Sequence, residues 1–185
     1  MLTLPNAVRL AVPQDVPELI ALMRGLAEFE DHIDDFRVDE QSLLARAFAS
    51  EAQCQIFVAD GNEQISGYAV VLEVPFTYDL RPTMLLKELY VANDCRGMGL
   101  GQALMRQVAS WAAGRGGGRI KWDVMAGNEH AEAFYQRLGG SPDCKWIPYQ
   151  MGRQEIERLA MSGQDETGRS ADLILESSIS RPASD

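Results

Sequence analysis

The sequence predicts a single-domain α/β fold in which helices flank a mixed central β-sheet. Three observations predict it. The chain has 185 residues, 46% of them apolar and 24% charged, which suits one core under a polar surface. Around the glycine-rich turn, strand-like segments alternate with helical segments, an order typical of a mixed sheet. Finally, a strand-like run at 86–91 leads through three alternate glycines into a helix, as at the ligand-binding turns of α/β proteins.

The N-terminal half opens with a strand and two helices. Residues 7–12 alternate apolar and polar side chains, which predicts a strand. Asp15 and Glu18 have the spacing of a capping box, so we expect a helix from there to about Glu30. A second helix is expected to start at Asp39, because one stripe then carries Leu43, Leu44, Ala47 and Phe48.

Three antiparallel strands are expected next. The runs 56–59 and 65–74 flank Asp60-Gly61-Asn62, which is typical of a hairpin turn. Residues 83–91 are rich in apolar side chains and predict a third strand.

The C-terminal half alternates helices and strands. One helix over 100–113 carries Leu100, Leu104, Val108 and Trp111 along one side. The expected elements that follow are a strand at 120–125, a helix at 128–138, a strand at 145–151 and a short helix to about 161. The composition then turns polar, so we expect a domain over 1–161 and a flexible tail over 162–185.

Composition argues against several classes of function. The net charge of −10 disfavours nucleic-acid and membrane-surface binding and suits cationic small molecules. With no leader-like N-terminus and no spanning apolar run, we expect a cytoplasmic protein. The three cysteines are widely spaced and expected to be reduced thiols. The two histidines, His32 and His130, give little support for a metal site or a histidine-centred triad.

The glycine turn predicts a phosphate cradle. Alternate glycines allow close approach to a ligand, successive amides face one concavity, and the helix N-terminus adds a positive dipole. The dinucleotide fingerprint fails because Gln102 and Leu104 stand where its third glycine would be, and no Gly-Lys-Ser/Thr completes a Walker A loop. The remaining pattern, Arg96-x-x-Gly99-x-Gly101, resembles the acyl-CoA pyrophosphate loop of the GNAT superfamily of N-acetyltransferases.

A second block carries the same resemblance. Residues 128–139, Asn-Glu-His-Ala-Glu-Ala-Phe-Tyr-Gln-Arg-Leu-Gly, are similar to the Asn-x-x-Ala-x-x-Phe-Tyr-x-x-x-Gly helix of that superfamily, in the same order and separation. The resemblance covers about residues 7–161. Within it, residues 26–30, residues 76–79 and Trp146 look like the diamine (spermidine/spermine) and thialysine N-acetyltransferase branch. Members of that branch are commonly dimers, so the resemblance implies a homodimer.

The resemblance implies a role for each matching position. Backbone groups of Leu89, Tyr90 and Val91 would meet the pantetheine arm and the acetyl carbonyl. The pyrophosphate would be held by Arg96, Gly97, Met98, Gly99, Leu100, Gly101 and Gln102, and the thiol end of coenzyme A by Asn128, Glu129, His130 and Ala131. The acceptor pocket would hold Phe29, Glu30, Trp122 and Asp123, together with Lys87. Tyr135 would be the general acid that protonates the departing thiolate.

General chemistry makes these roles reasonable. A primary alkylamine has a pKa of about 10.4, so something must accept its proton before it attacks at neutral pH. Attack on the thioester develops negative charge on oxygen, which strand amides can stabilise, and on sulfur, which a phenol can protonate.

One position departs from the branch. Diamine acetyltransferases resemble one another in carrying a glutamate where this chain has Lys87, and Glu88 stands one place along. Neighbours in a regular strand point to opposite faces, so Glu88 can replace that glutamate only if a bulge rotates it inward. Pairing with a neighbouring cation is the alternative for Glu88.

We therefore expect an acetyl-CoA-dependent N-acetyltransferase that acts on a primary amine, either a small polyamine or a lysine-like acceptor, by direct attack. Two alternatives stay open at this point. One is an acyl-CoA-binding regulatory module, which Lys87 favours, and the other is acetylation of a protein N-terminus or lysine.

Overall fold

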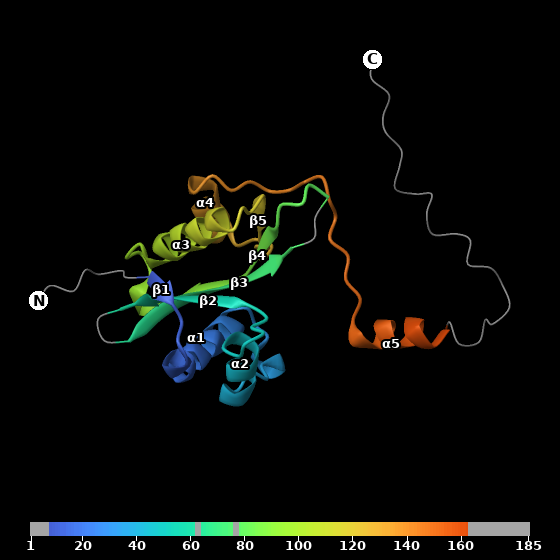
Figure 1. Cartoon of the computed structure of the whole chain (residues 1–185), viewed down its shortest axis with the longest axis horizontal. Coiled ribbons are helices and arrows are strands. Elements are labelled where there is room, and N and C mark those ends of the chain that lie inside the picture. Colours follow the sequence, from blue (N-terminus) through green and yellow to red (C-terminus); the bar gives the residue numbers. More distant parts are fainter. Residues whose placement is uncertain (1–7, 62–63, 76–77, 163–185) are drawn as a thin grey trace, which may run out of the picture. The chain divides into compact units, whose positions relative to one another are not determined.

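The computed structural model describes residues 8–61, 64–75 and 78–162 (Figure 1). Their contacts divide the chain into two units, residues 1–140 and 141–185. The first unit contains one five-stranded sheet in the order β1-β2-β3-β4-β5. The strands are β1 (Val8–Leu10), β2 (Gln55–Asp60), β3 (Ile65–Val74), β4 (Thr83–Val91) and β5 (Arg119–Lys121). The first four pair antiparallel and β4 pairs parallel to β5, which confirms the mixed sheet.

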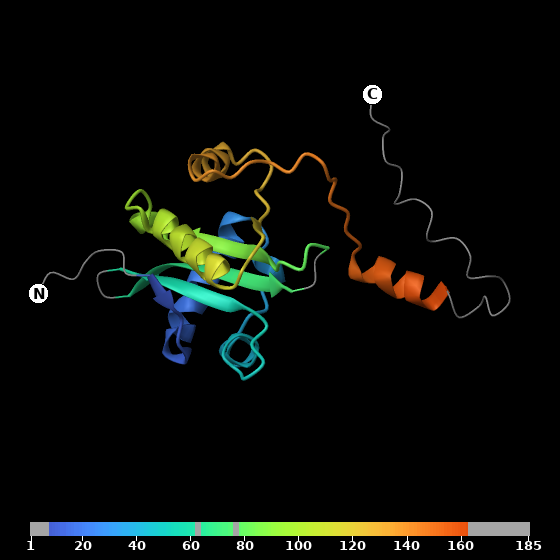
Figure 2. The same ribbon diagram turned by 45° about the horizontal axis from the view of Figure 1, so that its top comes forward.

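Helices cover both faces of this sheet. Helices α1 (Val16–Phe29) and α2 (Glu40–Ala47) lie on one face, and α3 (Leu100–Gly114) and α4 (Glu129–Arg137) on the other (Figure 1). Figure 2 shows α3, in yellow-green, lying along the strands. Short 3₁₀ turns occur at Pro13–Asp15, Ile33–Asp35 and Asn93–Cys95.

Each face has its own apolar core. The α1-side core includes Leu19, Ile56, Val58, Tyr68 and Val70. The α3-side core includes Phe57, Val71, Met84, Leu86, Leu104 and Val108. Adjacent residues of β2 and β3 thus face opposite cores, as a pleated strand with two covered faces requires. The stripe predicted for α3 is confirmed, because Leu100, Leu104 and Val108 are buried and Trp111 is partly buried.

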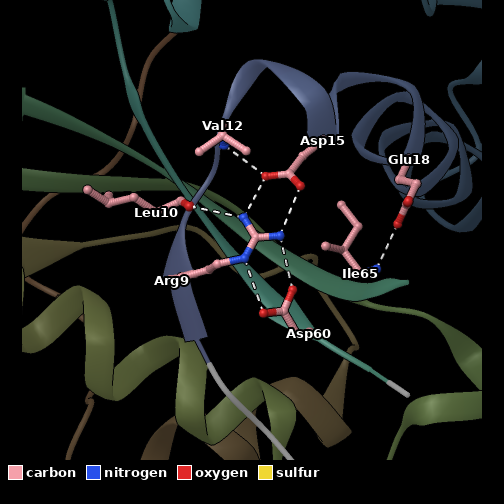
Figure 3. Close-up of polar contacts among 7 residues, drawn as sticks. All are labelled: Arg9, Leu10, Val12, Asp15, Glu18, Asp60 and Ile65. Atoms are coloured by element: carbon pink, nitrogen blue, oxygen red, sulfur yellow. Dashed lines mark hydrogen bonds and ion pairs between the residues drawn. The ribbon is translucent and has the colours of Figure 1, made fainter. Parts of the chain in front are cut away.

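The first helix begins at the predicted place for a different reason. Asp15 is its N-cap residue but makes no side-chain cap, so the predicted capping box is wrong. The Asp15 carboxylate instead accepts two hydrogen bonds from Arg9, at 2.7 and 2.9 Å, and one from the Val12 amide at 2.8 Å (Figure 3). Glu18 accepts from the Ile65 amide, 2.7 Å away (Figure 3). Both carboxylates therefore tie α1 to the sheet.

Most of the other elements predicted for this unit agree with the structure. Asp39 caps α2 by accepting from the Ser42 amide at 2.7 Å. The strand predicted at 83–91 is β4, and the two hairpin strands are β2 and β3. The strand predicted at 120–125 is partly wrong, because β5 ends at Lys121. Part of the strand at 7–12 and of the turn at 60–62 lies outside the described residues.

The second unit contains α5 (Arg153–Ser162), which confirms a helix near residue 161. Residues 145–151 form no strand within the described part of the chain, so that prediction is wrong. Within α5, Arg153 bonds Glu157 one turn later at 2.7 Å. The predicted tail falls mostly outside the described ranges, and the domain boundary at 161 stays a prediction. No helix among the described residues is long and apolar enough to cross a membrane.

Candidate active site

A large cavity opens where β4 and β5 separate. The two strands pair only between Thr83–Leu85 and Arg119–Lys121. Past Leu85, β4 continues to Val91 without a strand on that edge among the described residues, and 122–125 line the opposite wall. The cavity encloses about 1340 Å³, more than the roughly 300–1,000 Å³ typical of small-molecule sites. It is therefore large enough for two substrates at once.

The glycine loop forms one end of this cavity. Gly97 and Gly99 have φ of +77° and +83°, in the left-handed region that favours glycine. Gly99 is the N-cap of α3, and the Ala103 amide makes the first helical hydrogen bond, to the Gly99 carbonyl at 3.0 Å. The amides of residues 100–102 precede that bond and have no acceptor within the helix. A row of amides at a helix N-terminus is an anion-binding arrangement, so these residues fit a diphosphate.

Arg96 lies beside the loop and joins three elements. Its Nε donates to the Val91 carbonyl at 3.1 Å. Its guanidinium lies over the rings of Phe29 and Tyr90, 5.2 and 5.6 Å from their centroids. The side chain therefore connects the end of α1, the end of β4 and the loop.

Tyr135 stands on α4, across the cavity from β4. Asn128 begins this helix by accepting from the Ala131 amide at 3.1 Å, as expected for an N-cap. The Tyr135 ring lies 4.9 Å from that of Trp122 and 5.0 Å from that of Phe134. Burial raises the pKa of Tyr135 to about 12. The phenol is thus protonated at neutral pH and able to donate a proton.

A bulge in β4 determines where Glu88 points. The β3 pairing moves from Val71 with Leu86 to Val70 with Glu88, which leaves Lys87 as an extra residue. Leu86 belongs to the α3-side core, whereas Glu88 accepts a hydrogen bond from Tyr68, a residue of the α1-side core. The sequence predicts that Glu88 turns inward only if the strand contains a bulge, and the structure contains that bulge.

Charged side chains gather at the acceptor end of the cavity. Glu30, Lys87 and Asp123 line the main cavity and also an adjoining one of about 290 Å³. Two carboxylates favour an ammonium group, and the ammonium of Lys87 adds one positive charge to the same lining.

The structure brings together nearly all the residues predicted for the site. All of them line the cavity except Met98 and Glu129. The sequence reasoning missed eight lining residues: Leu26, Leu86, Cys95, Val124, Met125, Phe134, Arg137 and Leu138. Helical spacing gave a signal for two of them, since Phe134 and Leu138 lie three and seven residues after Ala131. Among the residues described, no group of three His, Cys, Asp or Glu side chains could hold a metal ion.

One cavity thus holds a loop that fits a diphosphate, an open strand edge and a protonated phenol. This combination suits an enzyme that transfers an acyl group from coenzyme A. Comparison with known proteins identifies the family. The model of the acetyltransferase (GNAT) family matches residues 22–140, and the chain belongs to that family. It is accordingly an acetyl-CoA-dependent N-acetyltransferase that acts on an amine, with acetyl-CoA as co-substrate.

The individual relatives share only modest sequence identity with this chain. The thialysine N-epsilon-acetyltransferase of Mus musculus is 26% identical over 164 residues, which cover 83% of this chain and 96% of the mouse protein. The spermidine/spermine N(1)-acetyltransferase-like protein 1 of Homo sapiens is 23% identical over 165 residues, 83% of this chain and 23% of the human protein. An integron cassette protein from the V. cholerae mobile metagenome has a TM-score of 0.73 at 21% identity, covering 85% of this chain and 99% of its own, and supports the fold.

Proposed function

We propose that this enzyme acetylates a small primary amine, either a polyamine or a lysine-like molecule, by direct attack of the amine on acetyl-CoA. The observation that carries the proposal is that one cavity holds the loop amides, Tyr135 on one wall and Glu88 on the other. Both substrates can then meet in a ternary complex, and no covalent enzyme intermediate is needed.

Each group has a defined task in the proposed reaction. The amides of residues 100–102 hold the diphosphate, and the backbone of β4 past Leu85 orients the thioester. Glu88 accepts a proton from the ammonium group, and the free amine attacks the carbonyl carbon. The attacking nitrogen then carries one proton more than the amide product and releases it to solvent. As the carbon–sulfur bond breaks, Tyr135 gives its proton to the sulfur, and the phenolate takes a proton back from solvent.

The acceptor end favours a small cationic molecule. Glu30 and Asp123 line both cavities there, and Phe29 adds an exposed aromatic ring at the end of α1. Relatives named for thialysine and for spermidine/spermine support this substrate class, because both names denote small amines.

A thiol-release assay with acetyl-CoA tests the proposal. The panel comprises polyamines, lysine and its analogues, amino acids without a second amine, and peptides. We expect release with molecules that carry a free distal primary amine, and calorimetric binding of coenzyme A without any acceptor. Release with peptides alone, or no release despite coenzyme A binding, would refute the proposed acceptor class.

A further inference from the structure

Tyr68 carries a hydroxyl group into the middle of the α1-side core. The residue is fully buried, at 0% exposure, and its ring lies 6.3 Å from that of Tyr90. Its hydroxyl donates to Glu88 Oε2 at 2.7 Å. A buried hydroxyl destabilises a core unless it finds a partner, and a phenylalanine would fill the same space without that requirement. The hydrogen bond to Glu88 is therefore what the hydroxyl group adds.

Satisfying one hydroxyl does not require a carboxylate. A backbone carbonyl would serve, whereas burying a charged acceptor carries a large desolvation penalty. Glu88 moreover lines the cavity, next to the extra residue of the β4 bulge. The hydrogen bond between Tyr68 and Glu88 thus connects the interior of the core to the cavity. A function in catalysis explains why a buried hydroxyl group and a buried carboxylate occur together here.

Several charges surround the Glu88 carboxyl group. Burial raises its pKa, and the hydrogen bond from Tyr68 is the largest influence in the opposite direction. Lys87 and His32 also lower the pKa of Glu88, whereas Glu30 raises it. Burial raises the pKa of the Cys54 thiol, which precedes β2, and the charge of Glu88 raises it further. Without the Tyr68 hydroxyl, the effect of burial on this pKa of Glu88 would be opposed by the charges of Lys87 and His32.

We propose that Tyr68 is a positioning residue for catalysis, which fixes the Glu88 carboxylate at the acceptor end of the cavity and keeps it in its charged, proton-accepting form. The inference rests on the proposed function, in which Glu88 takes the proton of the amine. Tyr68 touches no substrate and acts only through Glu88.

The Tyr68→Phe variant tests the proposal. It keeps the ring and removes only the donor, and a hydrogen bond to a charged group is worth enough to move a pKa by about one unit. We expect the acidic limb of the kcat–pH profile to move up by about one unit. Turnover should fall about tenfold on that limb and recover at higher pH. Ile56→Val is the matched control, because it trims the same core from a neighbouring strand and should leave the limb in place.

Two further measurements separate this role from a structural one. In a Glu88→Gln background, Tyr68→Phe should have no additional effect on turnover, since its target is absent. Carbon-13 NMR without substrates should show the Glu88 carboxyl signal, identified by its loss in Glu88→Gln, titrating about one pH unit higher in Tyr68→Phe.

The outcomes are distinct. An unshifted Glu88 titration, or an equal loss of turnover in the Glu88→Gln background, would overturn the role of Tyr68 alone. A wild-type enzyme that releases no thiol with any amine would overturn the proposed function instead, and the NMR titration would still report whether Tyr68 controls Glu88.

Discussion

Tyr135→Phe removes one hydroxyl group from the wall of the cavity and leaves the ring in place. The contacts of that ring with Trp122 and Phe134 persist, so we expect little change in stability. Because burial raises the pKa of Tyr135 to about 12, only about one molecule in ten thousand is ionised at pH 8. The Tyr135 phenol therefore keeps its proton at pH 8 and below.

The expected loss is in turnover. A positioned general acid contributes roughly 10²- to 10⁴-fold, equivalent to about 3 to 5 kcal/mol of transition-state stabilisation. We expect kcat to fall by that factor while the affinity for acetyl-CoA stays within about twofold, because the phenol acts when the carbon–sulfur bond breaks.

Two assays measure the effect separately. Thiol release at saturating substrates gives kcat, and calorimetry with acetyl-CoA gives the dissociation constant. Tyr78→Phe is the matched control, since it removes a hydroxyl group from an exposed tyrosine of the same unit that does not line the cavity. Equal losses of turnover and of acetyl-CoA affinity, or an unchanged kcat, would refute the role of Tyr135 as a general acid.

Three more predictions concern the loop, the acceptor end and the fold. Gly99→Ala should weaken coenzyme A binding about tenfold in calorimetry, because a left-handed residue costs an alanine about 1 to 2 kcal/mol. Gly116→Ala, which has a similar φ of +71° away from the cavity, should leave binding unchanged, and equal effects would contradict the loop's role. Lys87→Glu should raise the ratio of kcat/KM for cadaverine to kcat/KM for lysine by about tenfold, since the two acceptors differ only by the carboxylate that Lys87 attracts. An unchanged ratio would argue against contact between Lys87 and the acceptor. Asp15→Asn should lower the free energy of unfolding at pH 7 by about 1 to 2 kcal/mol in urea titrations, because the partner Arg9 is partly exposed. The pKa of Asp15 is lowered in the folded state, so this difference should shrink as the pH falls below about 4, and a constant difference would contradict the ion pair.

The sequence predicted the elements whose signals are local. The β4 strand, the glycine turn and the apolar stripe of α3 each lie within a short window, and the structure confirms all three. The lining of the cavity was also largely predicted, because much of it comes from two motifs that are visible in the sequence, the glycine loop and the segment 128–139.

The errors concern interactions between distant segments. Asp15 and Glu18 have the spacing of a capping box, but Arg9 and the Ile65 amide take their carboxylates. Residues 122–125 have a strand-like composition, yet a strand also needs a neighbour to pair with, and β4 diverges from them past Leu85. Periodicity cannot show which partner wins such a competition.

The extra residue in β4 has a consequence for how this enzyme can change. Since Lys87 pairs with no residue of β3, the ladder on either side of it would be regular without it. A substitution or even a deletion at position 87 would keep every other strand side chain on its present face. Natural variation could therefore alter the charge met by an incoming amine while the protein keeps its interior packing unchanged.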